Sequence, residues 1–313
     1  GCSGQDGSLL CKSLLRKGLE VFGTSRNPKN TISNHLSLKI SNNIRLEELD
    51  ICNIKAIEKL IQKVDPSEIY HLAAETSVGI SFNKPNQSFE SICIASNALL
   101  EASKQLDFDG KLFFAGSSEI FGDTKRKAKF NDTLNPKSPY GIAKTASMRM
   151  VKLYRELYNL KAVTGILFNH ESHLRPDEFV TKKIIKGAIQ SKKNKNYKLE
   201  VGNINIERDW GLAEEFVEAM QIQVRSKEIC DQVICTGEKT SLKTFIKKTF
   251  NLLGLNWKDH VFINPSFFRP HEILCSVGDP TKMQKDTGWR AKCKIDDLIQ
   301  NLLDKELLSN TNN

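Results

Sequence analysis

The chain has 313 residues, of which 39% are hydrophobic and 27% charged, enough for a large α/β domain with a smaller lobe. Its mean hydropathy of −0.38 and the lack of an apolar run of about 18 residues argue against a membrane-spanning protein. The net charge of +9 admits a nucleic-acid binder, but the lysine runs lack a nucleic-acid motif, and a protein that binds phosphorylated small molecules has the same balance.

Helices and strands alternate in the first half of the chain after the opening GCSGQDGS. Apolar residues recur with helical spacing in some segments and form short buried runs in others. In chain order the pattern predicts a helix over 9–17, a strand over 20–25, helix 54–64, strand 69–74, helix 87–105, strand 111–115, helix 140–158 and strand 162–168. This alternation predicts a Rossmann-like, doubly wound parallel sheet.

Beyond residue 168 the loops lengthen and short strands mix with helices, and the last helix carries an apolar stripe that begins at Ile295. The sequence has no internal repeat and no low-complexity linker. We therefore expect two interleaved units: a nucleotide-binding domain and a smaller C-terminal α/β lobe. The domain is expected to comprise residues 1–168 and 204–237, and the lobe residues 169–203 and 238–313.

The eight cysteines are dispersed and form no C-x-x-C pair. Several lie in apolar runs, so they are expected to be reduced core thiols of a cytoplasmic protein. His170 and His173 are three residues apart, but no third ligand is evident, and no metal site is predicted.

Gly1, Gly4 and Gly7 form a G-x-x-G-x-x-G turn that leads into a helix. Glycines let the backbone approach a pyrophosphate, and the N-terminus of a helix offers free N–H groups. Three glycines can also form an ordinary turn, so this signal depends on the other motifs.

The predicted strand over 20–25 ends in Ser25, and Arg26 follows it. Enzymes that use NAD usually place a carboxylate here to bind the ribose, whereas an arginine and a hydroxyl favour the additional phosphate of NADP. An ordinary surface arginine is the alternative. Asp50, at the end of LEELD, is a candidate for the adenine edge.

Tyr140 and Lys144 are four residues apart in a predicted helix and share one face. We expect the Lys144 ammonium to lower the pKa of the Tyr140 phenol and to bind the nicotinamide ribose. A phenolate near neutral pH could take a proton from a sugar hydroxyl. The pair is common by chance, but together with Ser117 after an upstream strand and with the glycine turn it is specific.

Ser117 is expected to hydrogen-bond the hydroxyl that Tyr140 deprotonates. Glu119, two residues further on, would point into the same cleft if the chain stays extended. A carboxylate beside a 4-keto sugar can remove the proton at C5, which leads to elimination of water across C5–C6. A solvated loop residue is the alternative for Glu119.

Nearly the whole chain resembles the GDP-mannose 4,6-dehydratases, members of the extended short-chain dehydrogenase/reductase family. The resemblance is carried by strings in the family's order: GCSGQDGS, SSEIFGDT, NPKSPYGIAK, GILFNHES, FVTKKI, GNINIERDWG, VICTGE, FFRPHEI and GDPTK. It implies conversion of GDP-mannose to GDP-4-keto-6-deoxymannose, in which C4 is transiently oxidised, water is eliminated across C5–C6, and the hydride returns from NADPH to C6.

The resemblance also implies residue roles. Catalytic roles fall on Ser117, Glu119, Tyr140 and Lys144. NADP contacts fall on Gly1, Gly4, Gln5, Asp6, Arg26, Asp50, Ala73, Lys144, His170 and Arg175. Nucleotide-sugar contacts fall on Ser81, Asn169, Lys183, Arg208, Arg269 and Glu272. Arginines in such a set can bind a diphosphate in a bidentate manner.

Three residues depart from the family's usual pattern. Glu75 replaces a more usual Gln and would place a negative charge near the pyrophosphate, which could weaken cofactor binding. His173 stands in place of Pro, and His271 in place of Thr. We expect these departures to be tolerated.

The first strand of this fold ordinarily lies in the middle of the sheet, beneath the cofactor, and no strand precedes Gly1. Losing about five buried apolar side chains forfeits on the order of 10 kcal/mol, about the whole stability of a domain. We therefore expect the 313 residues to be a fragment of a longer protein. Cooperative melting and NADP binding by the 313-residue chain would contradict this expectation.

Other functions are compatible with parts of the sequence. A GDP-4-keto-6-deoxymannose reductase shares the SSE string and the tyrosine–lysine pair, but not GQDGS, ILFNHES and RDWG. A non-catalytic NADP-binding regulator often lacks the tyrosine or the lysine. The resemblance further implies a homodimer or homotetramer formed through the helix of Tyr140 and the loop of Arg26. The apolar face of Met148, Val151 and Leu153 is compatible with such an interface, although a stripe of this kind is more often core.

Overall fold

The computed structural model describes residues 1–28 and 33–311. Within this part of the chain, none of the helices combines the length and the apolar composition that crossing a bilayer requires.

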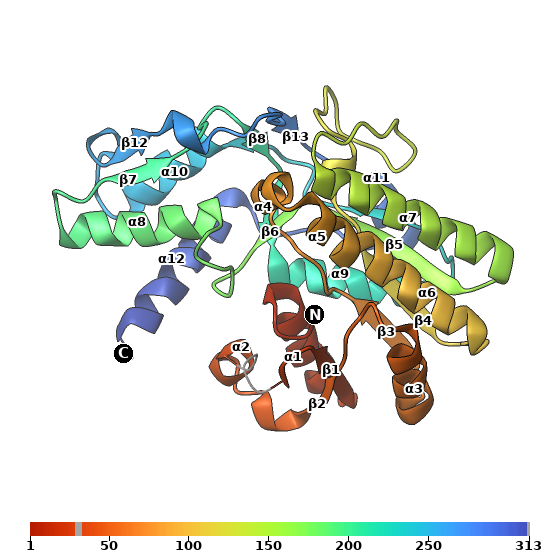
Figure 1. Cartoon of the computed structure of the whole chain (residues 1–313). Coiled ribbons are helices and arrows are strands. Elements are labelled where there is room, and N and C mark those ends of the chain that lie inside the picture. Colours follow the sequence, from red (N-terminus) through yellow and green to blue (C-terminus); the bar gives the residue numbers. More distant parts are fainter. Residues whose placement is uncertain (29–32, 312–313) are drawn as a thin grey trace.

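Two parallel sheets are formed mainly by the first half of the chain, and one of them also includes strands from the second half (Figure 1). The larger has four strands in the order β10-β5-β4-β3: Gln232–Ile234, Lys161–Leu167, Lys111–Ala115 and Glu68–His71. The smaller pairs β1 (Val21–Ser25) with β2 (Ile44–Glu48) in parallel. The predicted α/β class with parallel strands is confirmed. No described residue forms a strand between β1 and β3.

Helices cover both faces of the four-stranded sheet. Alternate residues of β4 show the two layers: Phe113 packs in one apolar core, whereas Leu112 and Phe114 pack in another. The first core contains α1 (Gln5–Arg16) and α9 (Ala213–Arg225). The second core contains α3 (Ile54–Val64), α6 (Ala95–Gln105) and α7 (Pro139–Tyr158). This is the three-layer arrangement that a parallel sheet requires, because both of its faces must be buried.

The helix boundaries follow local signals that the apolar pattern missed. α7 begins at Pro139, and the Ser138 hydroxyl caps it by accepting a hydrogen bond from Gly141 N at 3.0 Å. α1 begins at Gln5, four residues before the predicted start, with Gly4 as its N-cap and Gly7 in its first turn. The helix predicted over 87–105 is a run of α5 (Pro85–Phe89), a π turn (Glu90–Ile94) and α6.

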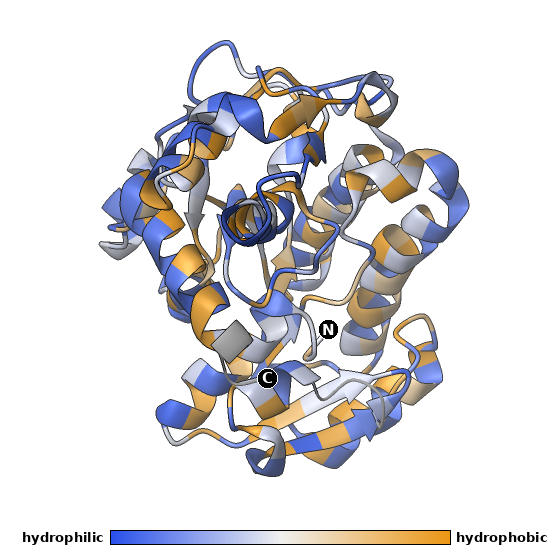
Figure 2. Ribbon diagram, turned by 90° about the vertical axis from the view of Figure 1, so that its left-hand side faces the viewer, coloured by the Kyte–Doolittle hydropathy of each residue, from blue (hydrophilic) through white to orange (hydrophobic). Residues whose placement is uncertain are grey.

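The second lobe has its own apolar core, built from α8 (Val180–Lys193), α10 (Leu242–Leu252) and α12 (Ile295–Thr311). Ile204 and Trp210 pack in this core, whereas Phe216, a few residues later, packs in the core of the sheet. Orange and blue bands alternate along the helices in Figure 2, as expected for helices with one apolar face. The domain boundaries at residues 169, 204 and 238 remain predictions.

Short elements complete the described chain. The helices are α2 (Ser33–Ser37), α4 (Val78–Asn83) and α11 (Thr281–Thr287), with 3₁₀ turns at Ser41–Asn43, Ser118–Ile120, Trp257–Asp259 and Pro265–Phe267. The strands are β6 (Asn169–Glu171), β7 (Leu199–Val201), β8 (Glu207–Arg208), β9 (Trp210–Leu212), β11 (Thr240–Ser241), β12 (Val261–Ile263) and β13 (Cys275–Ser276). All eight cysteines are unpaired. The expected core position holds for four of them, Cys2, Cys11, Cys93 and Cys235, which are buried, whereas Cys52, Cys230, Cys275 and Cys293 are only partly buried.

Candidate active site

The glycine turn lies at the carboxyl ends of β1 and β3. A Cβ on Gly1 would stand 2.5 Å from the carbonyl carbon of Leu72, and one on Gly7 would stand 2.0 Å from the Gly1 oxygen. Gly4 is the N-cap of α1, and a Cβ there would have room, with its nearest neighbour at 3.8 Å. Gly1 is therefore packed closely against the end of β3, and Gly7 against Gly1 and Cys2 of the turn itself. The turn presents the N-terminus of α1 toward the site.

Arg26 and Asp50 lie near each other beyond the carboxyl ends of β1 and β2, and both are exposed. Asp50 Oδ1 accepts a hydrogen bond from Cys52 N at 3.0 Å. Burial, together with Asp50, raises the pKa of Cys52, and Arg26 opposes that rise, so all three groups lie close together. An exposed guanidinium and a carboxylate thus flank the edge at which a dinucleotide ribose would bind.

Ser117, Tyr140 and Lys144 meet in a buried cluster, as the sequence predicts. Tyr140 and Lys144 lie one turn apart on α7, and the Tyr140 phenol forms a hydrogen bond with Ser117 at the end of β4. Lys144 Nζ donates to the Ala115 carbonyl at 2.7 Å and lies 5.7 Å from the centroid of the Tyr140 ring. All three side chains are buried.

The expected effect of Lys144 on Tyr140 is not found in this structure. Burial raises the pKa of Tyr140 to about 12, and the hydrogen bond from Ser117 and the charge of Arg175 only partly oppose it. Burial also lowers the pKa of Lys144 to about 8, against the charge of Asp6. Burial therefore keeps the phenol protonated near neutral pH, while the Lys144 ammonium donates to a backbone carbonyl.

Glu119 lies in a 3₁₀ turn (Ser118–Ile120) and not in the extended segment that the sequence reasoning assumed. Ser117 caps this turn by accepting a hydrogen bond from Glu119 N at 3.3 Å. Glu119 is nevertheless close enough to the other candidates for its charge to raise the pKa of Tyr140. Burial raises the pKa of Glu119, while Arg269 and Arg208 oppose that rise.

Three of the predicted nucleotide-sugar residues come together opposite Glu119. The buried Arg208 on β8 donates from Nη2 to Glu272 Oε1 at 3.2 Å, and Arg269 Nη1 lies 3.9 Å from the same oxygen. The guanidinium groups of Arg208 and Arg269 thus face the carboxylates of both Glu272 and Glu119. Two such cations can bind an anionic ligand.

The other predicted sugar-nucleotide residues make different contacts. Ser81 is buried in α4, and its hydroxyl donates to the Val78 carbonyl at 2.7 Å. Lys183 Nζ lies over the Phe267 ring at 4.9 Å from its centroid, and Asn169 begins β6. Within residues 1–28 and 33–311, no recorded contact joins these three residues to Arg208 or Glu272.

Four of the predicted cofactor residues form a network that ties α1 to β6. Asp6 Oδ2 pairs with His170 Nε2 at 2.9 Å, and Gln5 Nε2 donates to the His170 carbonyl at 3.1 Å. Burial raises the pKa of Asp6, but His170 and Gln5 outweigh it and hold that pKa at about 2. Arg175 Nε pairs with Glu171 at 3.0 Å and adds positive charge. Ala73 lies directly beside Gly1 at the end of β3.

Asp209 is a positioning residue that sequence reasoning did not single out. It is fully buried next to Arg208, and its carboxylate accepts hydrogen bonds from Thr236 N at 2.9 Å and Gly237 N at 2.9 Å. Burial raises the pKa of Asp209 to about 6 against these bonds. These hydrogen bonds hold the backbone beside Arg208 in place. In the sequence, only the string RDWG could have indicated that Asp209 has this role.

The three departures do not alter the cluster. Glu75 Oε1 accepts hydrogen bonds from Thr76 N and Ser77 N, both at 2.8 Å, so the carboxylate is held by the backbone of its own loop. His173 lies between α8 and α12, where burial lowers its pKa to about 4, and His271 is exposed. The side chains of His170 and His173 therefore serve separate contacts.

Comparisons with known proteins show which family the chain resembles. The family model for GDP-mannose 4,6 dehydratase matches residues 1–302. The chain is similar to GDP-mannose 4,6 dehydratase 1 of Arabidopsis thaliana, with 37% identity over 98% of this chain and 88% of the relative. It is also similar to the GDP-mannose 4,6 dehydratase of Homo sapiens, with 33% identity over 98% of this chain and 91% of the relative.

Solved structures with low identity share the fold. A UDP-glucose 4-epimerase from Thermotoga maritima superposes with a TM-score of 0.88 at 20% identity, covering 99% of this chain and 97% of that one. A dTDP-glucose 4,6-dehydratase from Bacillus anthracis, solved in complex with NAD, superposes with a TM-score of 0.86 at 18% identity, covering 99% and 96%.

Proposed function

The chain belongs to the GDP-mannose 4,6-dehydratase family of lyases, and we propose that it converts GDP-mannose to GDP-4-keto-6-deoxymannose with NADP. The proposal is supported by three interactions: Ser117 forms hydrogen bonds with the Tyr140 phenol and with the backbone nitrogen of Glu119, and the charge of Glu119 raises the pKa of Tyr140. Removal of a hydroxyl proton and removal of the C5 proton require two such bases at one sugar ring.

The glycine turn fits a nicotinamide dinucleotide. Gly1 and Gly7 leave no space for a Cβ, and the N-terminus of α1 adds free N–H groups for a pyrophosphate. When bound there, NADP supplies a hydride acceptor at the first step and a hydride donor at the last. The exposed Arg26 after β1 supports NADP over NAD, since a guanidinium can bind the additional phosphate.

The chain's own residues supply the remaining steps. Tyr140 takes the proton of the sugar's 4-hydroxyl, and Ser117 orients that hydroxyl. Glu119 then removes the C5 proton, whose acidity the neighbouring 4-keto group raises. It passes this proton to the C6 hydroxyl, which leaves as water. Arg208 and Arg269 bind the diphosphate and release Glu272 from its present pairing.

Because burial raises the pKa of Tyr140 to about 12, deprotonation of the phenol depends on positive charge brought near it. The Lys144 ammonium lies on the same helix face, 5.7 Å from the ring centroid. We expect Lys144 to leave the Ala115 carbonyl when ligands fill the site and to act on the phenol and on the nicotinamide ribose.

The test is an incubation of the purified chain with GDP-mannose and a catalytic amount of NADP. A 4-keto product without net change in NADPH supports dehydration. Consumption of NADPH on the 4-keto sugar, with GDP-mannose left unchanged, would assign the chain to the reductases.

Replacing Arg26 by Ala should weaken the binding of NADP about 10- to 100-fold, since charge-assisted hydrogen bonds to the phosphate are lost, while the binding of NAD changes little. The exposed Arg45 of β2 offers a control, Arg45→Ala.

We propose a homodimer or homotetramer in a reducing compartment, the cytoplasm. Of the three residues first considered for an interface, Met148 and Val151 are core residues, and only Leu153 is exposed. Ile142 and Leu157 of α7 are also exposed, at 54% and 60%. Light scattering of the wild type and of a Leu153→Lys, Leu157→Lys double variant tests this face.

A further inference from the structure

Glu171 is a buried carboxylate that the steps of the proposed reaction do not use. It is the last residue of β6, which pairs in parallel with β9, and it is only 2% exposed. The flanking His170 and Ser172 both bond to side chains of α1. Because side chains alternate in direction along an extended segment, Glu171 points the other way, toward the start of α8.

Both oxygens of this carboxylate have partners. Glu171 Oε2 accepts a hydrogen bond from the Thr181 hydroxyl in the first turn of α8 at 2.7 Å, and it lies 3.0 Å from Arg175 Nε. Glu171 Oε1 accepts from Arg175 Nη2 at 3.4 Å. Arg175 N donates to the Ser172 carbonyl at 3.1 Å, and this turn brings the guanidinium back to the carboxylate. Arg175 thus compensates the buried charge of Glu171.

The guanidinium of Arg175 is held on its face as well as on its edge. Its central carbon lies 4.1 Å from the centroid of the Phe179 ring, and its Nε atom is buried. A long side chain with contacts on two sides keeps one position, whereas an arginine with a single contact samples several rotamers. Glu171 and Phe179 therefore confine the positive charge of Arg175 to one place.

The charge of Arg175 reaches the phenol of the candidate active site. Burial raises the pKa of Tyr140 to about 12, and the hydrogen bond from Ser117 and the charge of Arg175 oppose that rise. The other charged groups near the phenol are Glu119, Asp6 and Lys144. Arg175 is therefore a cation that already favours loss of the phenol's proton, whereas Lys144 is bound to a backbone carbonyl.

We propose that Glu171 is a positioning residue for the oxidation at C4: its buried carboxylate fixes the Arg175 guanidinium where the positive charge assists removal of the Tyr140 proton. This role rests on the proposed function, since it concerns the same phenol. Two effects of removing the carboxylate have opposite signs. Loss of its negative charge would make the phenol more acidic, whereas displacement of Arg175 would make it less acidic. We expect displacement to dominate, because a buried guanidinium without its partner turns toward water.

The first test is Glu171→Gln, which keeps the size of the side chain and removes its charge. C4 oxidation is followed as formation of bound NADPH from NADP and GDP-mannose, in a Glu119→Gln background in which the reaction stops after this step. The rate near neutral pH should fall about tenfold, and its alkaline limb should move to higher pH. A profile that moves to lower pH, or one that keeps its position, would overturn the proposal.

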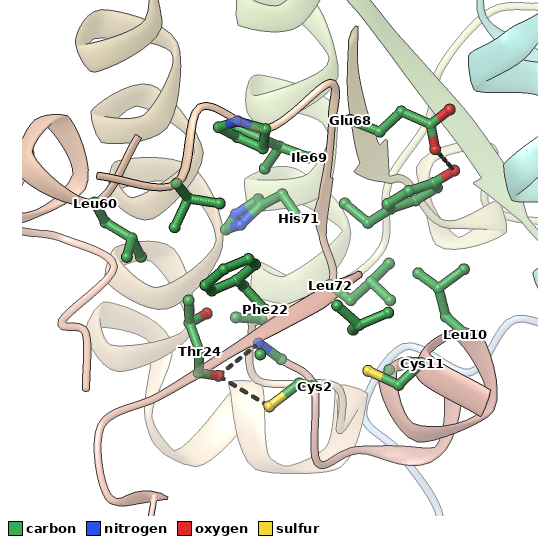
Figure 3. Close-up of a pocket in the computed structure, with 18 of the residues that line it drawn as sticks. Cys2, Leu10, Cys11, Phe22, Thr24, Leu60, Glu68, Ile69, His71 and Leu72 are labelled. Carbon is green, nitrogen blue, oxygen red and sulfur yellow. Dashed lines mark hydrogen bonds between the residues drawn. The ribbon is translucent and has the colours of Figure 1, made fainter. Parts of the chain in front are cut away.

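Glu68 offers a matched control, because it forms the same kind of pair at the amino end of the sheet. Its carboxylate accepts from Arg225 Nε at 2.6 Å and Nη2 at 2.9 Å, and from the Tyr70 hydroxyl at 2.8 Å (Figure 3). Glu68→Gln should leave the pH profile of C4 oxidation in place. An equal shift in Glu68→Gln and Glu171→Gln would overturn the proposal, because it would reflect a general loss of stability.

A double variant, Glu171→Gln with Arg175→Met, leaves neither charge of the pair buried. Its profile should lie at higher pH than that of the parent and should match that of Glu171→Gln. A further shift beyond Glu171→Gln would overturn the proposal, since Arg175 would then have kept its place without the carboxylate. Should Glu171→Gln fail to fold, the double variant carries the test against the parent, and an unmoved profile would overturn the proposal.

A measurement without substrate separates this role from the proposed function. Exchange of the Arg175 Nε proton, followed by NMR on isotope-labelled protein and assigned by its loss in Arg175→Met, should be slow in the wild type and fast in Glu171→Gln. Equal exchange in the two proteins would overturn the positioning by Glu171. The expected difference in exchange, found together with a wild type that leaves GDP-mannose unchanged, would reject the proposed function and retain the positioning of Arg175.

Discussion

At the scale of single residues, the proposed reaction depends on two bases with different environments. Burial raises the pKa of both Tyr140 and Glu119, but Arg269 and Arg208 oppose the rise only at Glu119. The negative charge of Glu272 partly neutralises the positive charges of these two arginines. An anionic substrate that takes over the arginines would therefore raise the pKa of Glu119 further and make its carboxylate a stronger base.

Replacing Glu119 by Gln should preserve the binding of NADP and GDP-mannose and the oxidation at C4. Loss of the C5 base should lower dehydration by about 10²- to 10⁴-fold. The measurement is exchange of the C5 proton with deuterated solvent, followed by NMR, alongside product formation. Asp132→Asn, which neutralises a surface carboxylate bound to Arg126, is the matched control. Undiminished exchange in Glu119→Gln would assign the base to another group.

The Asp6–His170 pair predicts how stability changes with pH. The folded-state pKa of Asp6 is about 2, below its ordinary value of 3.8, so its contribution is present above about pH 4 and is lost as the pH falls. The pKa of His170 is raised above 6.5, because Asp6 outweighs the burial that opposes it. The stabilisation that protonated His170 contributes is present below pH 6.5 and is lost as the pH rises through the raised pKa of His170.

Asp6→Asn should therefore lower the free energy of unfolding by about 2 kcal/mol between pH 4 and 6.5 and by less on either side. Urea titrations of both proteins at a series of pH values measure this difference. A constant difference from pH 3 to 9 would show that the loss is one of packing and not of charge. Asp109→Asn serves as the control here, since the Asp109 side chain is 93% exposed.

At the scale of helices and strands, the glycine turn determines where α1 begins. Gly7→Ala would place a Cβ 2.0 Å from the Gly1 oxygen, which is backbone and can yield only if the turn moves. Gly4→Ala has its nearest neighbour at 3.8 Å and is the matched control. We expect Gly7→Ala to lower Tm by several degrees, as a loss of about 1–3 kcal/mol implies, and Gly4→Ala to leave it nearly unchanged. Equal melting of the two variants in calorimetry would contradict this account of the turn.

Long periodic segments were predictable from sequence, whereas elements that depend on distant contacts were not. α3 and β4 have the predicted bounds, because their apolar residues repeat without interruption. β2 was missed, since its sequence IRLEE has few apolar residues and gains its pairing only from β1. The turn at Glu119 was expected to be extended, because no local signal revealed that the Ser117 hydroxyl would cap it.

The candidate site shows the same limit. The spacing of Tyr140 and Lys144 on one helix was visible in the sequence, and the pair does share a face. The hydrogen bond from Lys144 to the Ala115 carbonyl was not visible in the sequence, since it depends on a strand 29 residues earlier. The pairing of Arg208 with Glu272 spans 64 residues and likewise could be reached only through family resemblance, not through spacing.

At the scale of the whole molecule, a net charge of +9 affects how the proposed ligands arrive. GDP-mannose and NADP are both anions, and Arg208 and Arg269 lie at the point where we expect the diphosphate to bind. Long-range attraction between a cationic protein and an anionic ligand raises the association rate and is screened over a Debye length of about 10 Å at 0.1 M salt. Short-range contacts in the bound complex are screened much less.

The value of kcat/KM for GDP-mannose should consequently fall several-fold between about 0.02 and 0.2 M NaCl, while kcat at saturating substrate changes little. Steady-state assays at constant pH measure both quantities. Sucrose at matched viscosity is the control, because it slows diffusion without screening charge. A kcat/KM that does not change with salt would mean that substrate capture is governed by a slower step inside the site, such as the release of the two arginines from Glu272, and not by the field of the whole protein.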